Sequence, residues 1–268
     1  MSILFSGDFH ANATGELSRI TKKTLLPLYG REQFDAIQYH IILGDGGFLW
    51  HNNQRTDAYN FRMISYRPFP VLCVIGNHEP MLGMMDDLEE ADIGIGETVY
   101  KIHENPFVAY LKRGKIYTID GFTFLTLGGA LSIDLEYRIP SVSWWENEYW
   151  SEREKEELFR LLKKERSFDF VLSHTGPNSI NKKAQSKTAN IDKFLDKVAV
   201  LNDEVDNMIL CKQWWCGHWH NDIYHFDTHK NRGYQYLYYD TVILSKSQGL
   251  AVYNYAGEYR QPDDGWRG

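Results

Sequence analysis

The sequence has 268 residues, of which 43% are hydrophobic, 24% charged and 15% aromatic. This composition is that of a folded globular protein, and it excludes a chain that is disordered throughout. The length suits one large α/β domain with its own core. The net charge of −7 gives no basic footprint for nucleic acid, so we expect no extended duplex nucleic acid as a partner.

The cysteines and the N-terminus bear on the compartment. Cys73, Cys211 and Cys216 show no paired spacing, which favours buried reduced thiols over a disulfide framework. No apolar run approaches the length of a membrane span, and Met1 leads into the chain without a basic leader or a cleavable apolar stretch. We therefore expect a cytoplasmic protein without a membrane partner. The sequence does not indicate an oligomeric state.

The first half of the chain alternates between strand and helix patterns. Residues 3–5, 39–43 and 70–75 are short apolar runs, which suit strands buried on both faces of a parallel sheet. Apolar residues at helical spacing predict a helix over about residues 15–29. A crossover helix is predicted over about residues 57–65.

Shorter strand patterns follow. They cover residues 99–102, 115–119 and 122–127, and Asp120-Gly121 between the last two is a strong hairpin signal. These pieces predict a change from crossover units to antiparallel pairing.

The last third returns to mixed patterns. Ser151 and Glu154 form a capping box that predicts the start of a helix. A strand is predicted over residues 168–173 and a helix over residues 191–205. Antiparallel strands are predicted over residues 208–211, 223–226, 234–239 and 250–255.

This order of elements predicts two sheets packed together with helices outside. We expect residues 1–257 to form a single domain and residues 258–268 a polar, turn-rich tail.

Five segments, each at the end of a predicted strand, carry side chains that bind metal ions. They are Gly7-Asp8-Phe9-His10, Gly44-Asp45-Gly46-Gly47, Gly76-Asn77-His78-Glu79, Ser173-His174-Thr175 and Gly217-His218-Trp219-His220. Their aspartate, asparagine and histidine donors suit Mn²⁺, Fe or Zn²⁺, and not a soft thiolate site. Together they predict a site for two metal ions, whose dominant use in enzymes is in-line displacement at phosphorus.

Each histidine taken alone is more often an ordinary polar or buried residue. Turn chemistry does not explain five separate segments that all deliver compatible donors at the ends of strands. Ligands also collect beyond the carboxyl ends of parallel strands, which allows these loops to converge.

The five segments, in this order, resemble the calcineurin-like metallophosphoesterase superfamily. Its pattern of Asp-x-His, Gly-Asp, Gly-Asn-His-Glu, His and Gly-His-x-His spans residues 7 to 220 here. The resemblance implies a four-layer α/β/β/α sandwich, in which two mixed β-sheets are flanked by helices. It also implies a binuclear centre of divalent ions, with manganese first and iron or zinc as alternatives.

The resemblance assigns a role to each ligand. One metal would be held by Asp8, His10 and His220, the other by Asn77, His174 and His218, with Asp45 bridging the two. His78 would stay off the metals. A hydroxide between the metals would attack phosphorus, Asn77 would stabilise the phosphoryl oxygens, and His78 would protonate the leaving oxygen.

The expected function is hydrolysis of phosphoesters, with phosphomonoesters of a small molecule or a phosphoprotein first. A phosphodiesterase acting on nucleotides or nucleic acid is the alternative. A third reading is a protein-binding scaffold, as in some relatives of this fold with a degraded metal site. No predicted ligand is missing here, which disfavours the scaffold.

One branch of the superfamily, the Ser/Thr protein phosphatases, carries Gly-Asp-x-x-Asp-Arg-Gly after the second strand. Here residues 46–50 read Gly-Gly-Phe-Leu-Trp, so the carboxylate that orients the catalytic histidine and the arginine that binds phosphate are both missing. Arg138 is the candidate replacement, because a planar guanidinium suits phosphate. The alternative is a surface arginine paired with Asp134 or Glu136.

Two aromatic groups admit two interpretations. They are Trp144, Trp145, Tyr149 and Trp150, and the group of Trp214, Trp215 and Trp219. Stacking on a nucleobase is one, and core packing between a sheet and a helix is the other. Whether the segment near Trp144 forms a lid stays open.

Overall fold

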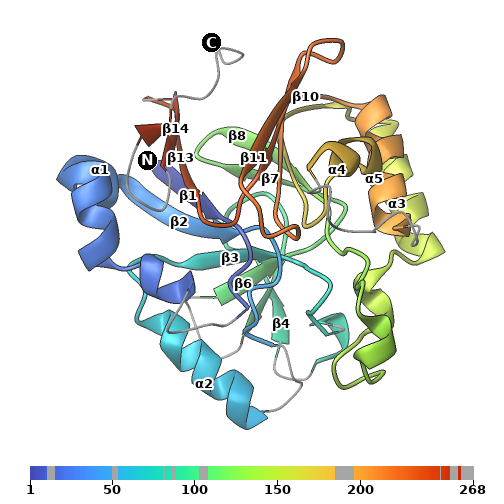
Figure 1. The fold of residues 1–268 in the computed structure, drawn as a ribbon, viewed down its shortest axis with the longest axis horizontal. Coiled ribbons are helices and arrows are strands. Elements are labelled where there is room, and N and C mark those ends of the chain that lie inside the picture. Colours follow the sequence, from blue (N-terminus) through green and yellow to red (C-terminus); the bar gives the residue numbers. More distant parts are fainter. Residues whose placement is uncertain are drawn as a thin grey trace.

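The structure is a computed structural model that describes residues 1–10, 16–49, 54–80, 82–85, 88–102, 108–184, 196–247, 249–253 and 259–260. Within these residues the strands form two sheets (Figure 1). The larger has the order β15-β14-β13-β1-β2-β3-β6-β5-β4, and the smaller β11-β12-β10-β9-β8-β7.

The strands of the larger sheet are β1 (Ser2–Ser6), β2 (Ile37–Ile42), β3 (Val71–Val74), β4 (Leu88–Ala91), β5 (Val99–Ile102), β6 (Val108–Leu111), β13 (Thr241–Ser245), β14 (Gly249–Tyr253) and β15 (Tyr259–Arg260). Those of the smaller sheet are β7 (Lys115–Ile119), β8 (Phe122–Thr126), β9 (Ser167–Leu172), β10 (Leu210–Cys216), β11 (Ile223–Asp227) and β12 (Arg232–Tyr236). The α-helices are α1 (Lys22–Ala36), α2 (Gln54–Ser65), α3 (Glu152–Leu162), α4 (Asn178–Ala184) and α5 (Lys197–Met208). Short 3-10 helices are η1 (Glu16–Arg19), η2 (Leu82–Met84), η3 (Leu135–Tyr137) and η4 (Glu146–Glu148).

Both sheets are mixed. In the larger sheet β1, β2, β3 and β6 pair in parallel, and β13 joins β1 antiparallel. In the smaller sheet β8, β9, β10 and β12 pair in parallel, while β7 and β11 are antiparallel edge strands. The prediction that the last strands are all antiparallel is therefore wrong for β10, which lies between two parallel neighbours.

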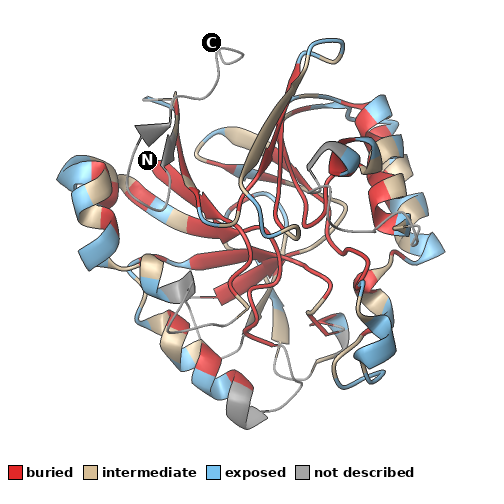
Figure 2. Cartoon of the chain, viewed as in Figure 1, coloured by how far each residue is buried: buried red, intermediate tan, exposed pale blue. Residues whose placement is uncertain are grey.

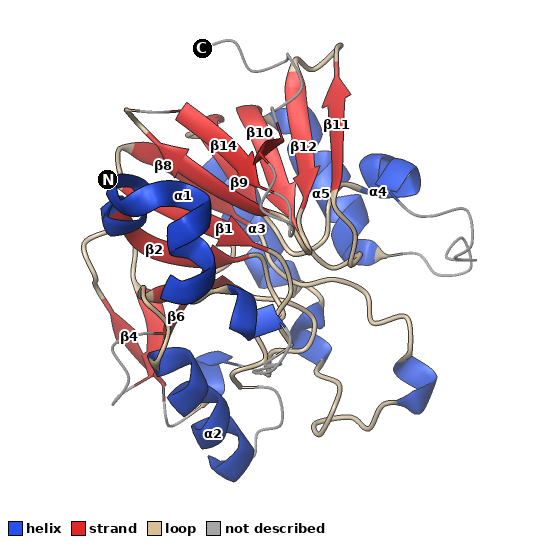
Figure 3. Cartoon of the chain, turned by 60° about the vertical axis from the view of Figure 1, so that its left-hand side comes forward, coloured by secondary structure: helices blue, strands red, loops and turns tan. Residues whose placement is uncertain are grey.

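Three apolar cores separate four layers, as Figure 3 shows from the side. One core lies between the two sheets. A second joins the outer face of the larger sheet to α1 and α2, through residues such as Leu25 and Ile64. The third joins the outer face of the smaller sheet to α3 and α5, through residues such as Leu158 and Val205. The expected α/β/β/α sandwich is confirmed.

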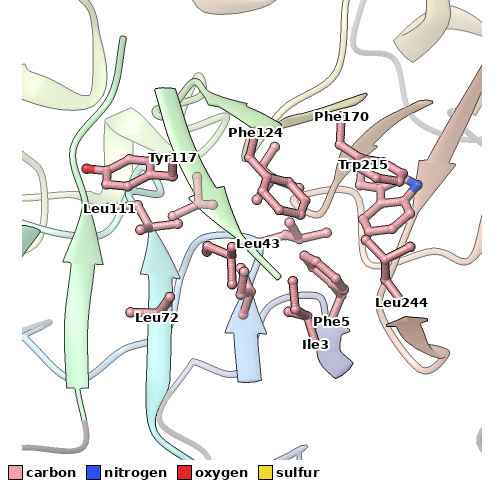
Figure 4. Packing of buried hydrophobic residues seen from close by; sticks show 14 of the residues in the cluster. Ile3, Phe5, Leu43, Leu72, Leu111, Tyr117, Phe124, Phe170, Trp215 and Leu244 are labelled. Carbon is pink, nitrogen blue, oxygen red and sulfur yellow. The ribbon is translucent and has the colours of Figure 1, made fainter. Parts of the chain in front are cut away.

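Alternation along the strands explains how one chain supplies three cores. Successive side chains of a strand point to opposite faces. Phe5 and Trp215 therefore enter the core between the sheets, with ring centroids 4.6 Å apart (Figure 4), while Leu4 and Trp214 enter the outer cores. Figure 2 shows the consequence: the strands at the centre are buried, and the helices expose their outer faces.

The sequence signals for a specific turn and for a specific helix cap are confirmed by the structure. The Asp120-Gly121 turn joins β7 to β8, and both residues have positive φ, at 51° and 75°. Ser151 caps α3 through the predicted box with Glu154. The first helix begins later than predicted, at Lys22, because Thr21 and Thr24 form a capping box there. Its predicted end at Tyr29 comes just before a kink at Gly30, where φ is 75°, and a second helical piece continues to Ala36.

Other helix and strand boundaries differ from the predicted ones. Residue 208 ends α5 and belongs to no strand, and β10 runs from Leu210 to Cys216. Residues 191–195 of the predicted helix lie outside the described residues, and α5 begins after its cap Asp196. β4, β6 and β13 were not predicted. Tyr259–Arg260, inside the expected tail, pairs with β14. Residues 261–268 lie outside the described residues. No described helix has the length and hydropathy that a membrane crossing requires.

His40 on β2 should make the fold sensitive to acid. It is fully buried, its Nε2 lies 2.7 Å from Ser6 Oγ, and burial lowers its pKa from 6.5 to about 3. Below pH 6.5 the unfolded chain therefore binds a proton that the native chain refuses, so stability falls as the pH falls towards 3. We expect this histidine to cost about 2 kcal/mol between pH 7 and pH 5.

Urea unfolding at the two pH values measures this effect. The variant His40→Gln should lose about 2 kcal/mol less than the wild type on acidification. Equal losses in both proteins would show that His40 does not enter the folded state as a neutral base.

Candidate metal centre

The predicted ligands converge where the two sheets present the carboxyl ends of their strands. Asp8, Asp45 and Asn77 follow the parallel strands β1, β2 and β3 of the larger sheet. His174 follows β9, and His218 and His220 follow β10, in the smaller sheet. This is the edge at which loops of parallel strands meet.

Asp45 lies at the centre of the cluster. Its Oδ2 is 3.2 Å from His174 Nε2 and 3.5 Å from His10 Nε2. Its other oxygen accepts a hydrogen bond from the backbone N–H of His78, at 3.0 Å. The side chain is 2% exposed, so one oxygen of this carboxylate faces both halves of the cluster away from water.

Asp8 anchors one half. Its Oδ2 is 3.1 Å from His220 Nε2, and the ring centroids of His10 and His220 are 4.8 Å apart. The donor atoms of these three residues are close enough together to hold one ion. Asp8 also accepts the backbone N–H of His218 at 2.9 Å, which fixes the carboxylate.

His174 anchors the other half and is fully buried. Its Nδ1–H donates to the carbonyl oxygen of Leu43 at 2.8 Å. Its Nε2 lies 2.9 Å from Asn77 Oδ1, and the ring centroid of His218 is 4.9 Å away. A backbone partner on one ring nitrogen leaves the other free as a ligand, which is the usual arrangement of metal-binding histidines.

The chemistry of these atoms fits a cation. In a neutral His174 that donates from Nδ1, the atoms Nε2, Asn77 Oδ1 and Asp45 Oδ2 all carry lone pairs and face one another. Burial alone would lower the pKa of His174, but the carboxylates of Asp45 and Asp8 outweigh it and raise the pKa to about 10. The position therefore demands a positive charge, which either a proton or a metal ion supplies.

Backbone conformation marks the same residues. Seven non-glycine residues among those described have positive φ, and four of them are predicted ligands: His10, Asp45, His218 and His220. This conformation costs energy and gathers at functional sites. Two glycines that directly precede predicted ligands leave no room for a side chain. A Cβ at Gly76, before Asn77, would lie 2.1 Å from Asp45 Oδ1, and one at Gly217, before His218, would lie 2.3 Å from Asp8 Oδ1.

His78 lies at the edge of the cluster, with Nε2 3.6 Å from Asp45 Oδ2. Its donor atoms are also close enough to His10 and Asp45 to join a metal site, so geometry alone does not keep it off the metals. Burial lowers the pKa of His78 to about 4, and Arg138 adds to this effect while Asp45 opposes it.

Arg138 belongs to the same group. Its two terminal nitrogens lie 2.7 Å and 3.1 Å from the ring nitrogens of His78. Its Nε donates to Asp134 at 2.6 Å, and the side chain is 12% exposed. The pairing with Asp134 that the surface alternative predicted is present, but the guanidinium is mostly buried against His78.

Two further polar residues beside the cluster, Ser132 and Glu148, were not among the predicted site residues. Ser132 Oγ accepts a hydrogen bond from Asn77 Nδ2 at 2.9 Å, and it donates to Glu148 at 2.6 Å. Serine is not a typical ligand for these metals, and its partners are far away in the chain. The signal available was a polar residue directly after the apolar Ala130-Leu131, just beyond a predicted strand.

The aromatic groups serve mostly as core. Trp214 and Trp215 are 0% exposed, while Trp145 and Trp150 are 8% and 5% exposed. Trp150 donates from its indole to the carbonyl oxygen of Gly128 at 2.8 Å. The interpretation of packing between a sheet and a helix therefore holds for Trp150 and Trp214, while Trp215 packs between the two sheets.

Comparison with known proteins identifies the family of the chain. The family model of calcineurin-like phosphoesterases matches residues 1–222. Among curated proteins, none matches the chain. A dimetal phosphatase from Danio rerio has a similar structure, with 14% identity, a TM-score of 0.51 and 95% of each chain covered.

Two more distant structures show lower scores. GAP50, the anchor in the inner membrane complex of Plasmodium, has 9% identity and a TM-score of 0.48, over 99% of this chain and 86% of that one. The NAD nucleotidase NadN of Haemophilus influenzae has 13% identity and a TM-score of 0.40, over 97% of this chain and 59% of that one. From the family match, the chain belongs to the calcineurin-like phosphoesterase family and is a phosphoester hydrolase.

Proposed function

We propose that the protein hydrolyses phosphomonoesters, of a small molecule or a phosphoprotein, with two divalent cations, manganese first. The observation that carries this proposal is the buried convergence of lone-pair atoms from both sheets around Asp45 Oδ2. Carboxylate, amide and imidazole donors together suit Mn²⁺, iron or zinc.

The cluster divides into two ligand sets that share one carboxylate. Asp8, His10 and His220 would hold one cation, and Asn77, His174 and His218 the other. Asp45 would contact both. When bound, two such cations activate water and neutralise charge that develops on the phosphoryl oxygens.

The residues around the cluster would handle the substrate. His78, at the edge of the cluster, is placed to give a proton to the leaving oxygen. The lowered pKa of His78 keeps it neutral at pH 7 in the absence of substrate. A phosphate dianion beside the ring raises that pKa, because it favours the protonated form.

Arg138 supports the choice of monoesters. A phosphomonoester is a dianion near neutral pH, and it carries one more negative charge than a diester. The guanidinium of Arg138 against His78 adds a fixed positive charge at the place where that group would bind. The acidic chain also lacks a basic track for a long polynucleotide.

The cytoplasm is the compartment that we propose. All three cysteines are free thiols, and two of them are buried. Proteins exported to oxidising compartments more often use their cysteines in disulfides.

Hydrolysis of p-nitrophenyl phosphate and of bis(p-nitrophenyl) phosphate tests the proposal. We expect turnover after loading with Mn²⁺, loss of turnover after chelation, and a preference for the monoester. A strong preference for the bis-ester would make the protein a phosphodiesterase. No turnover of either ester by metal-loaded protein would favour a binding scaffold.

Arg138→Ala should raise KM for the monoester by about 10- to 100-fold, because a charge-assisted hydrogen bond contributes about 1.5–3 kcal/mol. Steady-state kinetics measure the change. Arg153→Ala is the matched control, since Arg153 forms an i,i+4 pair with Glu157 as Arg138 does with Asp134, but is 88% exposed. If the two variants have the same kinetics, Arg138 does not bind phosphate.

A further inference from the structure

Asn77, Ser132 and Glu148 form a buried chain of hydrogen bonds beside the cluster. Asn77 Nδ2 donates to Ser132 Oγ at 2.9 Å, and Ser132 Oγ donates to Glu148 Oε2 at 2.6 Å. The three residues are 2%, 3% and 0% exposed. Bulk water therefore does not compete for either hydrogen bond, and the buried polar atoms of these residues rely on one another as hydrogen-bond partners.

The carboxylate sets the direction of this chain. A carboxylate accepts hydrogen bonds, and both the hydroxyl and the backbone N–H of Ser132 face Glu148, at 2.6 Å and 3.5 Å. The hydroxyl of Ser132 has a single proton, and it donates that proton in its hydrogen bond to Glu148 Oε2. Ser132 Oγ can then only accept from Asn77, so it must face the NH₂ end of the amide.

The other end of the amide follows from this. With Nδ2 directed at Ser132, the oxygen Oδ1 points to His174, and it lies 2.9 Å from Nε2. An amide rotated by half a turn would direct N–H groups at the cluster, where they would repel a cation.

We propose that Ser132 and Glu148 are positioning residues that hold the amide of Asn77 with its carbonyl oxygen toward the metal centre. This inference rests on the proposed function, because it takes Asn77 as a metal ligand. Partners behind a metal ligand typically contribute about 10- to 100-fold in metal affinity.

The same stretch of chain supports both residues of the Asn77-His78 pair. Ser132 and Arg138 lie between β8 and α3, in the green to yellow-green part of Figure 1. Ser132 accepts a hydrogen bond from Asn77 and donates one to Glu148. Arg138 contacts His78 and donates a hydrogen bond to Asp134. The segment thus gives a polar partner to each of these two residues.

Calorimetric titration of the metal-free protein with Mn²⁺ tests the role of Ser132. Wild type should bind two ions, and Asn77→Ala identifies the binding step that depends on this ligand. Ser132→Ala should weaken that same step by about 10- to 100-fold and leave the other unchanged. Ser132→Thr, which keeps the hydroxyl, should restore the affinity.

Two further variants complete the test. Ser245→Ala removes a buried serine hydroxyl on β13 and should leave both steps unchanged. Glu148→Gln keeps the shape but not the charge that directs the Ser132 hydroxyl, so it should weaken the same step by less. Glu148→Gln also tests the inference if the Ser132→Ala variant does not fold.

Two results would overturn the inference. One is wild-type affinity in both Ser132→Ala and Glu148→Gln. The other is an equal weakening of both steps, which indicates a general loss of structure. A wild-type protein that binds no Mn²⁺ would contradict the proposed function itself, and would be seen before any variant is measured.

Discussion

Replacement of His78 by alanine should lower kcat by about 10²- to 10⁴-fold while the metal content stays that of the wild type. The expected loss is that of a general acid, because His78 borders the cluster without being needed to complete either ligand set. Its Nε2 is 3.6 Å from Asp45 Oδ2, and that of His10 is 3.5 Å away, so the metal content has to be measured together with the kinetics.

The dependence on the leaving group makes this prediction specific. The p-nitrophenolate ion leaves without a proton, whereas an alkoxide needs one. His78→Ala should therefore impair an alkyl phosphate more than p-nitrophenyl phosphate. A residue that only shaped the pocket would impair both esters alike.

Metal analysis of each variant supplies the control. His229→Ala changes an exposed histidine of the β11–β12 turn and should match the wild type in every assay. If His78→Ala lost bound metal and kept its turnover per loaded site, His78 would be a ligand. The proximity of its donor atoms to those of His10 and Asp45 makes that a real alternative.

Much of the fold was predictable because the local sequence pattern of most strands indicates which of their faces are buried. Apolar runs such as residues 70–75 indicate strands buried on both faces, and those around β2 and β3 are. β13 was missed because its apolar run, Val242 to Leu244, is three residues long and, unlike the equally short run of residues 3–5, does not lead into a candidate ligand segment. β4 escaped because Glu89 and Glu90 give this edge strand a polar pattern.

The candidate site was predictable to the extent that residue type and local spacing define it. The five segments brought eight of the nine candidate residues to one place, all but Arg138, and pairs such as His218 and His220 are near in sequence. The hydrogen bond from Asn77 to Ser132 spans 55 residues, and the contact of Arg138 with His78 spans 60. Neither contact leaves a local pattern, so only the folded chain shows which side chains lie against Asn77 and His78.

Stability should depend most on a polar cluster at the far end of the smaller sheet. Asp206 at the end of α5 is 2% exposed, and its carboxylate accepts from Arg232, Lys230 and the hydroxyl of Tyr234. Arg232, also 2% exposed, donates in addition to the carbonyl oxygen of Ile209 at 2.7 Å. The cluster thus ties the last turn of α5 to β12.

Asp206→Ala should lower the free energy of unfolding by about 3–5 kcal/mol, because it leaves the buried charge of Arg232 without its partner. For a chain of this size the expected fall in Tm is about 10 °C. Thermal unfolding followed by circular dichroism measures it. Asp35→Ala is the control, since Asp35 pairs with Arg31 at the surface and is 52% exposed, where such pairs contribute about 0–1 kcal/mol.

Turnover per folded molecule should survive this change. Asp206 lies before β10, and the candidate metal ligands His218 and His220 follow this strand, so its seven residues separate the two clusters by about 20 Å. Active Asp206→Ala protein with a lowered Tm is therefore expected at temperatures below its transition. A variant that kept its Tm would show that Arg232 finds other acceptors or water. A variant that lost turnover while folded would show that β10 transmits strain from α5 to His218 and His220.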